Sequence, residues 1–191
     1  MKIGLFFGSF NPIHVGHLII ADYFCKYSDL DEVWMLPSPH NPLKKKTSLL
    51  AYHQRIEMIR LSLEAVPYIK INTIEKDLPQ PSYTITTLEA LKKKFPKNKF
   101  VLIMGEDNLS TLHKWKDYEV LLTDYQIYVF PRFGAEPHTY GEHKNVKILA
   151  NTPKIEISST FIRNSVKDKK TIAYMMNIEA FKYLELMNFY K

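Results

Sequence analysis

The sequence has one cysteine, Cys25, among its 191 residues. A single thiol cannot form an intrachain disulfide or supply a cysteine-rich zinc site, so both are excluded. Long apolar runs are also missing, and none approaches the roughly 20 residues that cross a bilayer. The first residues lack the apolar core and the small-residue cleavage site of a signal peptide. We therefore expect a protein of a reducing, cytoplasmic compartment that has no membrane partner.

Internal repeats, low-complexity tracts and linker-like segments are lacking as well. The 46% hydrophobic and 24% charged residues are typical of a globular domain that buries a core without metal or disulfides. We expect one domain over residues 1–191, with a helical portion from about residue 159. The Pro and Gly rich segment 131–141 is the best candidate for a mobile surface loop.

The formal net charge of +6 would suit a nucleic-acid binder, and it would equally suit an enzyme of phosphorylated substrates. The lysines form short, separate clusters at 44–46, 92–94 and 167–170, with no interleaved aromatic ladder. We interpret most of them as solvated surface and single out Lys44 as the exception.

Apolar runs alternate with segments of helical spacing along the chain. Strands are predicted at 2–7, 32–36, 69–74, 100–104, 126–130 and 146–149, and helices at 14–27, after Thr47 with Tyr52, Ile56, Ile59 and Leu63 on one face, and at 84–95. This alternation predicts an α/β protein with a Rossmann-like, doubly wound parallel sheet and helices on both faces. Ligands should bind beyond the carboxyl ends of the strands, after Phe7, Leu36 and Met104.

The segment from Gly8 to His17 follows the first predicted strand directly. Gly8 lets the backbone pass close to a phosphate, and the next helix start offers free amides and a positive dipole end. His14 and His17 lie three residues apart, on one face of that helix start, with Gly16 between them leaving room for a nucleotide. A zinc site is the weaker alternative, because Asp22 and Cys25 are further along the helix. The segment predicts a phosphate site.

Two motifs carry a resemblance to a known family. Gly-Ser-Phe-Asn-Pro-x-His-x-Gly-His, over residues 8–17, resembles the signature of the nucleotidylyltransferase superfamily, whose His-x-Gly-His binds the phosphates of ATP. Residues 157–163, Ile-Ser-Ser-Thr-Phe-Ile-Arg, resemble its carboxyl-terminal Ile-Ser-Ser-Thr-x-Ile-Arg motif. Ser159 and Thr160 are also natural N-cap residues, and Arg163 could make a forked contact to a triphosphate.

Three further segments resemble the nicotinate mononucleotide adenylyltransferases within this superfamily. They are Pro-Ser-Tyr-Thr at 81–84, Gly-Glu-Asp-Asn-Leu at 105–109 with Trp115 beyond it, and the loop 39–44 that ends in Lys44. The chain departs from the commonest pattern at Phe7, Ser9 and Asn11, where Gly, Thr and Asp are usual. Ser9 keeps a hydroxyl and Asn11 keeps a short polar side chain, so these two substitutions should preserve hydrogen bonding but remove one negative charge near the phosphates.

The resemblance implies transfer of the AMP of ATP to nicotinate mononucleotide, with magnesium carried mainly by ATP and no metal held by the protein. It assigns catalysis to His14, His17, Lys44 and Arg163. It assigns ATP binding to Gly8, Ser9, Phe10, His14, Gly16, His17, Gly105, Asp107, Ile157, Ser158, Ser159, Thr160 and Arg163. It assigns the pyridine mononucleotide to Ser9, Lys44, Tyr83, Thr84 and Trp115, and we place Asp107 on the ribose or base side.

Several alternatives stay open at this point. The acceptor could be nicotinamide mononucleotide or phosphopantetheine, although Tyr83, Thr84 and Trp115 argue against the latter. A nucleic-acid binding module is a more distant alternative, since class I aminoacyl-tRNA synthetases share the His-x-Gly-His element. The chain is too short for such a core with an anticodon-reading domain, so we expect no nucleic-acid partner. A homo-oligomer is compatible with the sequence.

Overall fold

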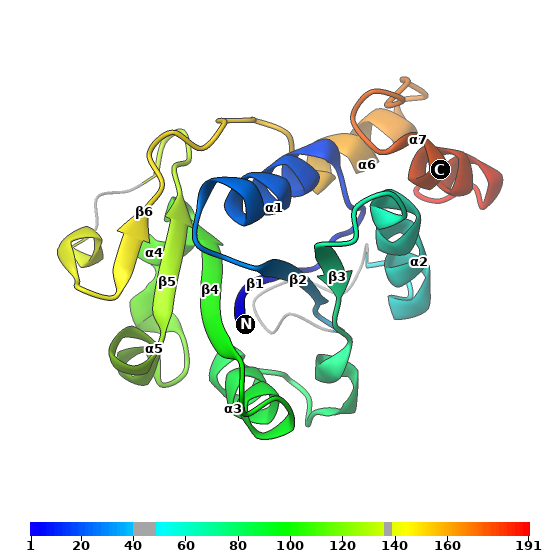
Figure 1. Cartoon of the computed structure of the whole chain (residues 1–191). Coiled ribbons are helices and arrows are strands. Elements are labelled where there is room, and N and C mark those ends of the chain that lie inside the picture. Colours follow the sequence, from blue (N-terminus) through cyan, green and yellow to red (C-terminus); the bar gives the residue numbers. More distant parts are fainter. Residues whose placement is uncertain (40–48, 136–138) are drawn as a thin grey trace.

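The computed structural model describes residues 1–39, 49–135 and 139–191, which form one parallel sheet with helices on both faces (Figure 1). The strands are β1 (Lys2–Gly8), β2 (Glu32–Pro37), β3 (Ile69–Ile71), β4 (Lys99–Gly105), β5 (Gln126–Phe130) and β6 (Val146–Ile148). Their order is β3-β2-β1-β4-β5-β6, and every neighbouring pair is parallel. The predicted Rossmann-like, doubly wound sheet is confirmed.

The helices pack against both faces of the sheet. They are α1 (Val15–Tyr27), α2 (Tyr52–Leu63), α3 (Thr84–Lys94), α4 (Glu106–Ser110), α5 (Tyr118–Asp124), α6 (Ser159–Lys167) and α7 (Ile178–Leu186), with 3-10 turns η2 (Ile74–Asp77), η3 (Leu112–Lys114) and η4 (Tyr140–Glu142). Figure 1 shows α1 and α6 on one side of the sheet and α3 and α5 on the other. None of the helices described is both long and apolar enough to cross a membrane.

Successive strand residues feed two separate cores. In β2, Val33 and Met35 join the cluster under α1, α2, α6 and α7, whereas Trp34 and Leu36 join the cluster under α3, α4 and α5. Side chains of a strand point alternately to opposite faces, so a strand covered on both faces must be apolar at every position. This explains why the central strands could be recognised as continuous apolar runs.

Several elements differ from the sequence prediction. The third strand ends at Ile71 rather than at residue 74, because the side chain of Asn72 accepts from the backbone N–H of Ile74 and starts the η2 turn. The short helices α4 and α5 were not predicted. In the segment 131–141, Arg132 and Phe133 are exposed and η4 begins at Tyr140, while residues 136–138 lie outside the described part.

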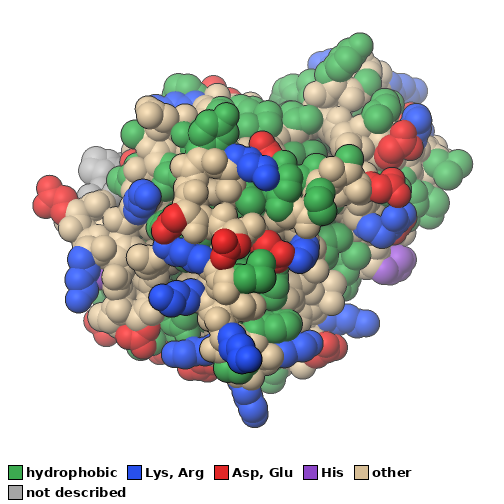
Figure 2. All heavy atoms as spheres, viewed as in Figure 1, with side chains coloured by type: hydrophobic (Ala, Val, Ile, Leu, Met, Phe, Trp, Pro, Cys, Tyr) green, Lys and Arg blue, Asp and Glu red, His purple; other side chains and the backbone are tan. Residues whose placement is uncertain are grey.

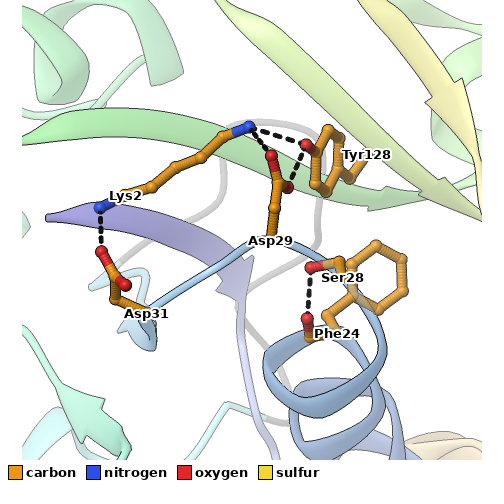
Figure 3. A network of polar contacts seen from close by, with 6 residues as sticks. All are labelled: Lys2, Phe24, Ser28, Asp29, Asp31 and Tyr128. Atoms are coloured by element: carbon orange, nitrogen blue, oxygen red, sulfur yellow. Dashed lines mark hydrogen bonds and ion pairs between the residues drawn. The ribbon is translucent and has the colours of Figure 1, made fainter.

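The amino-terminal end of the sheet is fastened by a polar network (Figure 3). Nζ of Lys2 donates to Asp29 at 2.6 Å and to the hydroxyl of Tyr128 at 2.8 Å, and Tyr128 in turn bonds Asp29. The backbone N–H of Lys2 donates to Asp31 at 2.6 Å. These contacts join the starts of β1 and β2 to β5, at the end of the sheet opposite to the expected ligand site.

The charged side chains are mixed on the face shown in Figure 2. Lys and Arg side chains lie scattered over it, with Asp and Glu among them. This view therefore shows no single basic stripe of the kind that tracks a nucleic-acid backbone.

Candidate active site

The chain leaves β1 through a tight turn at Gly8. A Cβ atom at this position would come within 2.8 Å of the ring of Phe10, so glycine lets that ring fold back against the turn. Phe10 is buried and has a φ of 44°, in the left-handed region that few non-glycine residues adopt. Packing thus holds the turn in an uncommon backbone conformation, as is frequent at functional sites.

Two stacked histidines stand at the start of α1. His14 precedes the first helical residue, and its ring centroid lies 3.6 Å from that of His17. The backbone N–H of His14 donates to Nδ1 of His17 at 3.3 Å. This bond places the proton of a neutral His17 ring on Nε2, which is then a donor. The prediction that both rings share one face of the helix start is confirmed.

Burial controls the charge of His14, whose side chain is only 5% exposed. Burial lowers the pKa of His14 from 6.5 to about 4, and the positive charge of Arg132 adds to this shift. His14 is therefore neutral near pH 7. The stack does not bring two positive charges together at that pH.

Gly16 allows a close approach of two distant segments. A Cβ atom on Gly16 would lie 2.7 Å from Cγ2 of Ile157 and 3.0 Å from Nδ1 of His14. The absent side chain lets the carboxyl-terminal motif pack onto the start of α1. Gly16 also lines the cleft described below, and the expectation that it leaves room for a nucleotide stays a prediction.

Helix α6 begins within the carboxyl-terminal motif and is capped by Ser158. The Ser158 hydroxyl accepts from the backbone N–H of Phe161 at 3.1 Å. The interpretation of Ser159 or Thr160 as the cap is wrong, because the first helical residue is Ser159 and the cap must precede it.

Ser159 and Arg163 bind this motif to the turn after β1. Oγ of Ser159 donates to the carbonyl of Pro12 at 2.8 Å, and Nη1 of Arg163 donates to the carbonyl of Asn11 at 2.8 Å. Nη2 of Arg163 donates to the hydroxyl of Thr160 at 3.1 Å. These two bonds use two of the five guanidinium donors. The two motifs recognised in the sequence thus form one structure.

A cleft of about 890 Å³ opens beside this structure, at the carboxyl ends of β1, β4 and β5. Twelve of the thirteen residues assigned to ATP line it: Gly8, Ser9, Phe10, His14, Gly16, His17, Asp107, Ile157, Ser158, Ser159, Thr160 and Arg163. The other, Gly105, lies in the wall of a neighbouring cavity. A Cβ atom on Gly105 would lie 2.3 Å from Oδ1 of Asp107. The absence of a side chain at Gly105 therefore leaves the space that the Asp107 carboxylate occupies.

The neighbouring cavity has a volume of about 340 Å³ and is lined by Tyr83, Thr84 and Trp115. Nζ of Lys116 lies 5.0 Å from the centre of the Tyr83 ring. Trp115 is half-buried and also packs against the core cluster that contains Leu121 and Leu122. The residues assigned to the mononucleotide therefore gather here, except Ser9, which lines the cleft, and Lys44, which lies outside the described residues.

The cleft and the cavity adjoin one another. Both are lined by Phe6, Phe7, Gly8, Asn108 and Phe130. A ligand in one space can therefore meet a ligand in the other beside the turn at Gly8, at the point where the sheet order reverses between β1 and β4.

Two cations of the cleft, Arg132 and Lys154, were not predicted. Nε of Arg132 lies 3.6 Å from Oδ1 of Asp107, and its backbone N–H donates to Glu106 at 3.3 Å. A signal was present, because Arg132 lies just beyond the carboxyl end of β5, where a parallel sheet places its ligands. Lys154 gave no such signal.

Arg55 was also missed, and it is fully buried. Its guanidinium group donates to the carbonyls of Ser9 at 2.6 Å, Ser38 at 2.9 Å and Pro39 at 3.2 Å, and to that of Leu50 at 3.1 Å. It therefore joins the loops after β1 and β2 to the segment before α2. The predicted apolar face of α2 is wrong in part, because Arg55, Met58 and Ile59 are buried while Tyr52 and Ile56 are only half-buried.

Asn11, one of the departures from the family pattern, is buried beneath the same turn. Its Oδ1 accepts from the backbone N–H of Leu50 at 3.1 Å and from the hydroxyl of Tyr190 at 2.7 Å. Burial raises the pKa of Tyr190, which keeps that hydroxyl a donor. The amide oxygen thus has a structural role that a neutral side chain can fill.

Metal-binding groups do not gather in the part of the chain that the structure describes. No three His, Cys, Asp or Glu side chains there are placed to hold one metal ion. Asp22, considered above for zinc, instead accepts from the hydroxyl of Tyr68 at 2.6 Å.

Comparisons with known proteins agree with this geometry. A family model described as cytidylyltransferase-like matches residues 5–165. A Flavobacterium johnsoniae protein named "probable nicotinate-nucleotide adenylyltransferase" is 53% identical over 192 residues and is matched, like this chain, over 100% of its length. A Flavobacterium psychrophilum protein of the same name is 51% identical, again with 100% of both chains covered.

A solved structure has a similar fold. It is the Plasmodium falciparum nicotinic acid mononucleotide adenylyltransferase complexed with NaAD, which aligns with a TM-score of 0.82 and 17% identity, covering 99% of this chain and 97% of that one.

Proposed function

Since this chain belongs to the cytidylyltransferase-like family, we propose that it transfers the AMP of ATP to nicotinate mononucleotide, forming nicotinate adenine dinucleotide and pyrophosphate. Full-length relatives with about half of their residues identical carry the name of this activity. The product is a precursor of NAD, so the reaction belongs to NAD biosynthesis.

The junction of the two cavities at Gly8 is the observation that carries this proposal. The larger cleft contains the histidine pair, the start of α1 and Arg163, which are the groups that bind phosphates in proteins. The smaller cavity contains aromatic and hydroxyl side chains suited to a planar ring. A triphosphate in the first and a mononucleotide in the second would bring their phosphates together beside Gly8.

The reaction needs no protein nucleophile. A phosphate oxygen of the mononucleotide attacks the α-phosphorus of ATP, the bond from that phosphorus to the oxygen bridging the α and β phosphates breaks, and pyrophosphate leaves with the bond's electron pair. Catalysis then depends on holding the groups in line and on stabilising the charge that develops on the leaving oxygens.

The described donors of the cleft match that requirement. Nε2 of His17, the neutral ring of His14 and the remaining donors of Arg163 supply hydrogen bonds to phosphate oxygens. The two histidines contact each other and Arg163 is held by Asn11 and Thr160, so these donors are in place before substrate arrives and little reorganisation accompanies the reaction. Lys44 is proposed to add a further positive charge.

Magnesium is proposed to enter with the triphosphate. The described residues offer no carboxylate cage, and Mg²⁺ usually keeps several waters and takes few protein ligands. Asp107 is a carboxylate that lines the cleft and would accept from waters of the ion or from the ribose. The ion supplies charge neutralisation on the triphosphate.

For the acceptor, Trp115 is proposed to stack on the pyridinium ring, whose positive charge suits the electron-rich indole face. Tyr83 and Thr84 lie at the start of α3, where the first backbone amides can donate to an anionic group such as a carboxylate. These amides favour nicotinate over nicotinamide.

Pyrophosphate release tests the proposal. The purified chain is assayed with ATP, Mg²⁺ and one acceptor at a time: nicotinate mononucleotide, nicotinamide mononucleotide or phosphopantetheine. We expect the largest kcat/KM with nicotinate mononucleotide. A larger value with either other acceptor would contradict the assignment of substrate, and no release with any acceptor would contradict adenylyl transfer.

A further inference from the structure

A buried carboxyl group lies beside the smaller cavity and has no part in the chemistry above. Glu75 belongs to the η2 turn after β3, and it is only 2% exposed. It lines the same cavity as Tyr83, Thr84 and Trp115. Burying a carboxyl group costs free energy that an apolar side chain of similar size would not, so its presence calls for a physical reason.

The contacts of Glu75 reach both ends of the segment that carries Tyr83 and Thr84. Its Oε1 accepts from the hydroxyl of Thr87 at 2.9 Å, and its backbone carbonyl accepts from Nε2 of Gln80 at 3.0 Å. Gln80 precedes the segment, and Thr87 follows it in the first turn of α3. Glu75 therefore holds both ends of one short stretch of chain.

Thr87 connects the carboxyl group to the cavity wall. Its side chain is fully buried, and its hydroxyl lies 3.2 Å from the carbonyl of Tyr83 as well as close to Glu75. The hydroxyl has one proton, which these two acceptors share. The Glu75 oxygen is thus linked to the backbone of Tyr83 through this one hydroxyl.

The surroundings of the carboxyl group are hydroxylic. Burial raises the pKa of Glu75, while the hydroxyls of Thr87, Ser38 and Ser82 oppose that shift. Its second oxygen, Oε2, makes no hydrogen bond of normal geometry within the described residues. Ser38 directly follows β2 and Ser82 precedes Tyr83, so the carboxyl group lies between the carboxyl end of β2 and this segment.

We propose that Glu75 is a positioning residue for the mononucleotide, which holds the 80–87 segment so that Tyr83 and Thr84 receive the pyridine ring. Its carboxyl group acts through the hydroxyl of Thr87 and does not touch the reacting phosphorus, whereas the bond from Gln80 is to its backbone carbonyl and remains in any variant of the side chain. The inference rests on the proposed function, because it takes the ligand of the smaller cavity to be the acceptor. ATP binds in the other space, so its binding should be insensitive to Glu75.

The test compares Michaelis constants for the two substrates in four variants. Glu75→Ala removes the carboxyl group, Thr87→Val removes only the hydroxyl, and Glu75→Gln keeps an oxygen that can accept from Thr87. Glu89→Gln is the matched control, since Glu89 is exposed on the same helix as Thr87. Thermal unfolding is measured for each variant.

We expect Glu75→Ala and Thr87→Val to raise the KM for nicotinate mononucleotide about tenfold, equivalent to ~1.4 kcal/mol of binding, with the KM for ATP changed less than about twofold. Glu75→Gln should restore the wild-type KM to within about threefold, and Glu89→Gln should match the wild type. A fifth variant, which combines Glu75→Ala with Thr87→Val, should raise the KM for the mononucleotide by less than the product of the two single effects, because the two residues act through one hydrogen bond.

Equal increases in the KM for both substrates, or increases in KM that parallel a lower melting temperature, would show that Glu75 only supports the fold. Either result would overturn the inference. An unchanged KM for the mononucleotide in Glu75→Ala would do the same. If the wild type forms no dinucleotide, the proposed function fails instead. Calorimetric titration with nicotinate mononucleotide then still compares Glu75→Ala with the wild type, and a wild type that does not bind it would overturn both.

Discussion

At the scale of single residues, His14 and His17 differ in burial although their rings stack at 3.6 Å. His14 is almost fully buried, whereas His17 is half-buried and its ring also contacts Phe10 edge-on at 5.0 Å. The bond from the His14 backbone fixes the His17 tautomer. His17 is therefore the better placed to donate to a phosphate, and His14 supports its orientation.

We predict that His17→Ala lowers kcat about 100-fold or more, the scale at which one well-placed transition-state donor acts. The fold should survive, because the ring is half-buried and no core cluster includes it. Steady-state kinetics and thermal unfolding measure both effects. His53→Ala, an exposed histidine on α2, is the control. Normal turnover in His17→Ala would remove this residue from the mechanism.

The lowered pKa of His14 predicts a loss of stability in acid. Between the ordinary value of 6.5 and the folded value of about 4, the unfolded chain binds a proton that the native state does not. Stability should therefore fall as pH falls through this window, by about 2 kcal/mol from this residue between pH 7 and pH 5.

Urea unfolding at the two pH values checks this expectation. His14→Gln has a similar shape and does not titrate, so it should lose about 2 kcal/mol less than the wild type on going from pH 7 to pH 5. An equal loss in the two proteins would show that other groups govern the acid response.

At the scale of elements, the site depends on the contact between the start of α1 and the segment before α6. Gly16 and Ile157 make this contact, and Ser159 and Arg163 secure it with bonds to Pro12 and Asn11. The groups proposed to bind phosphate come from two distant segments, and contacts of side chains with the turn after β1 and with Gly16 hold these segments together. A small displacement of either segment should alter the alignment of the reacting groups.

Gly16→Ala tests this dependence. The added Cβ would meet Cγ2 of Ile157 at 2.7 Å and push the α6 segment away. Alanine also favours the helix by about 1 kcal/mol over glycine, so stability should change little. We expect kcat/KM to fall about tenfold or more, since misplacement by about 1 Å can cost 100-fold. Wild-type kcat/KM with an unchanged melting temperature would show that the contact does not align the site.

The sequence predicts some of these elements better than others, for physical reasons. Strands β4 and β5 are buried on both faces, so their continuous apolar runs identify them, and the glycine turn follows from its place after β1. Arg55 could not be foreseen, because its four carbonyl partners come together only in the folded chain. The cap at Ser158 was misplaced because three hydroxyl residues in a row offer three equivalent helix starts.

At the scale of the whole molecule, stability and chemistry occupy opposite ends of the sheet. The network of Lys2, Asp29 and Tyr128 joins the start of β1 and the segment before β2 to β5 (Figure 3), while the cleft and the smaller cavity open at the carboxyl ends of the strands. The sheet order reverses between β1 and β4, which places Gly8 at the junction of the two spaces. This arrangement favours direct transfer between two bound nucleotides.

Isotope tracing of the transferred group tests direct adenylyl transfer. The chain is incubated with unlabelled ATP, Mg²⁺ and nicotinate mononucleotide whose phosphate oxygens are ¹⁸O, and both products are analysed by mass spectrometry. If a phosphate oxygen of the mononucleotide attacks the α-phosphorus, all of the label appears in nicotinate adenine dinucleotide and none in pyrophosphate. Labelled pyrophosphate, or ATP consumption without a labelled dinucleotide, would contradict the account.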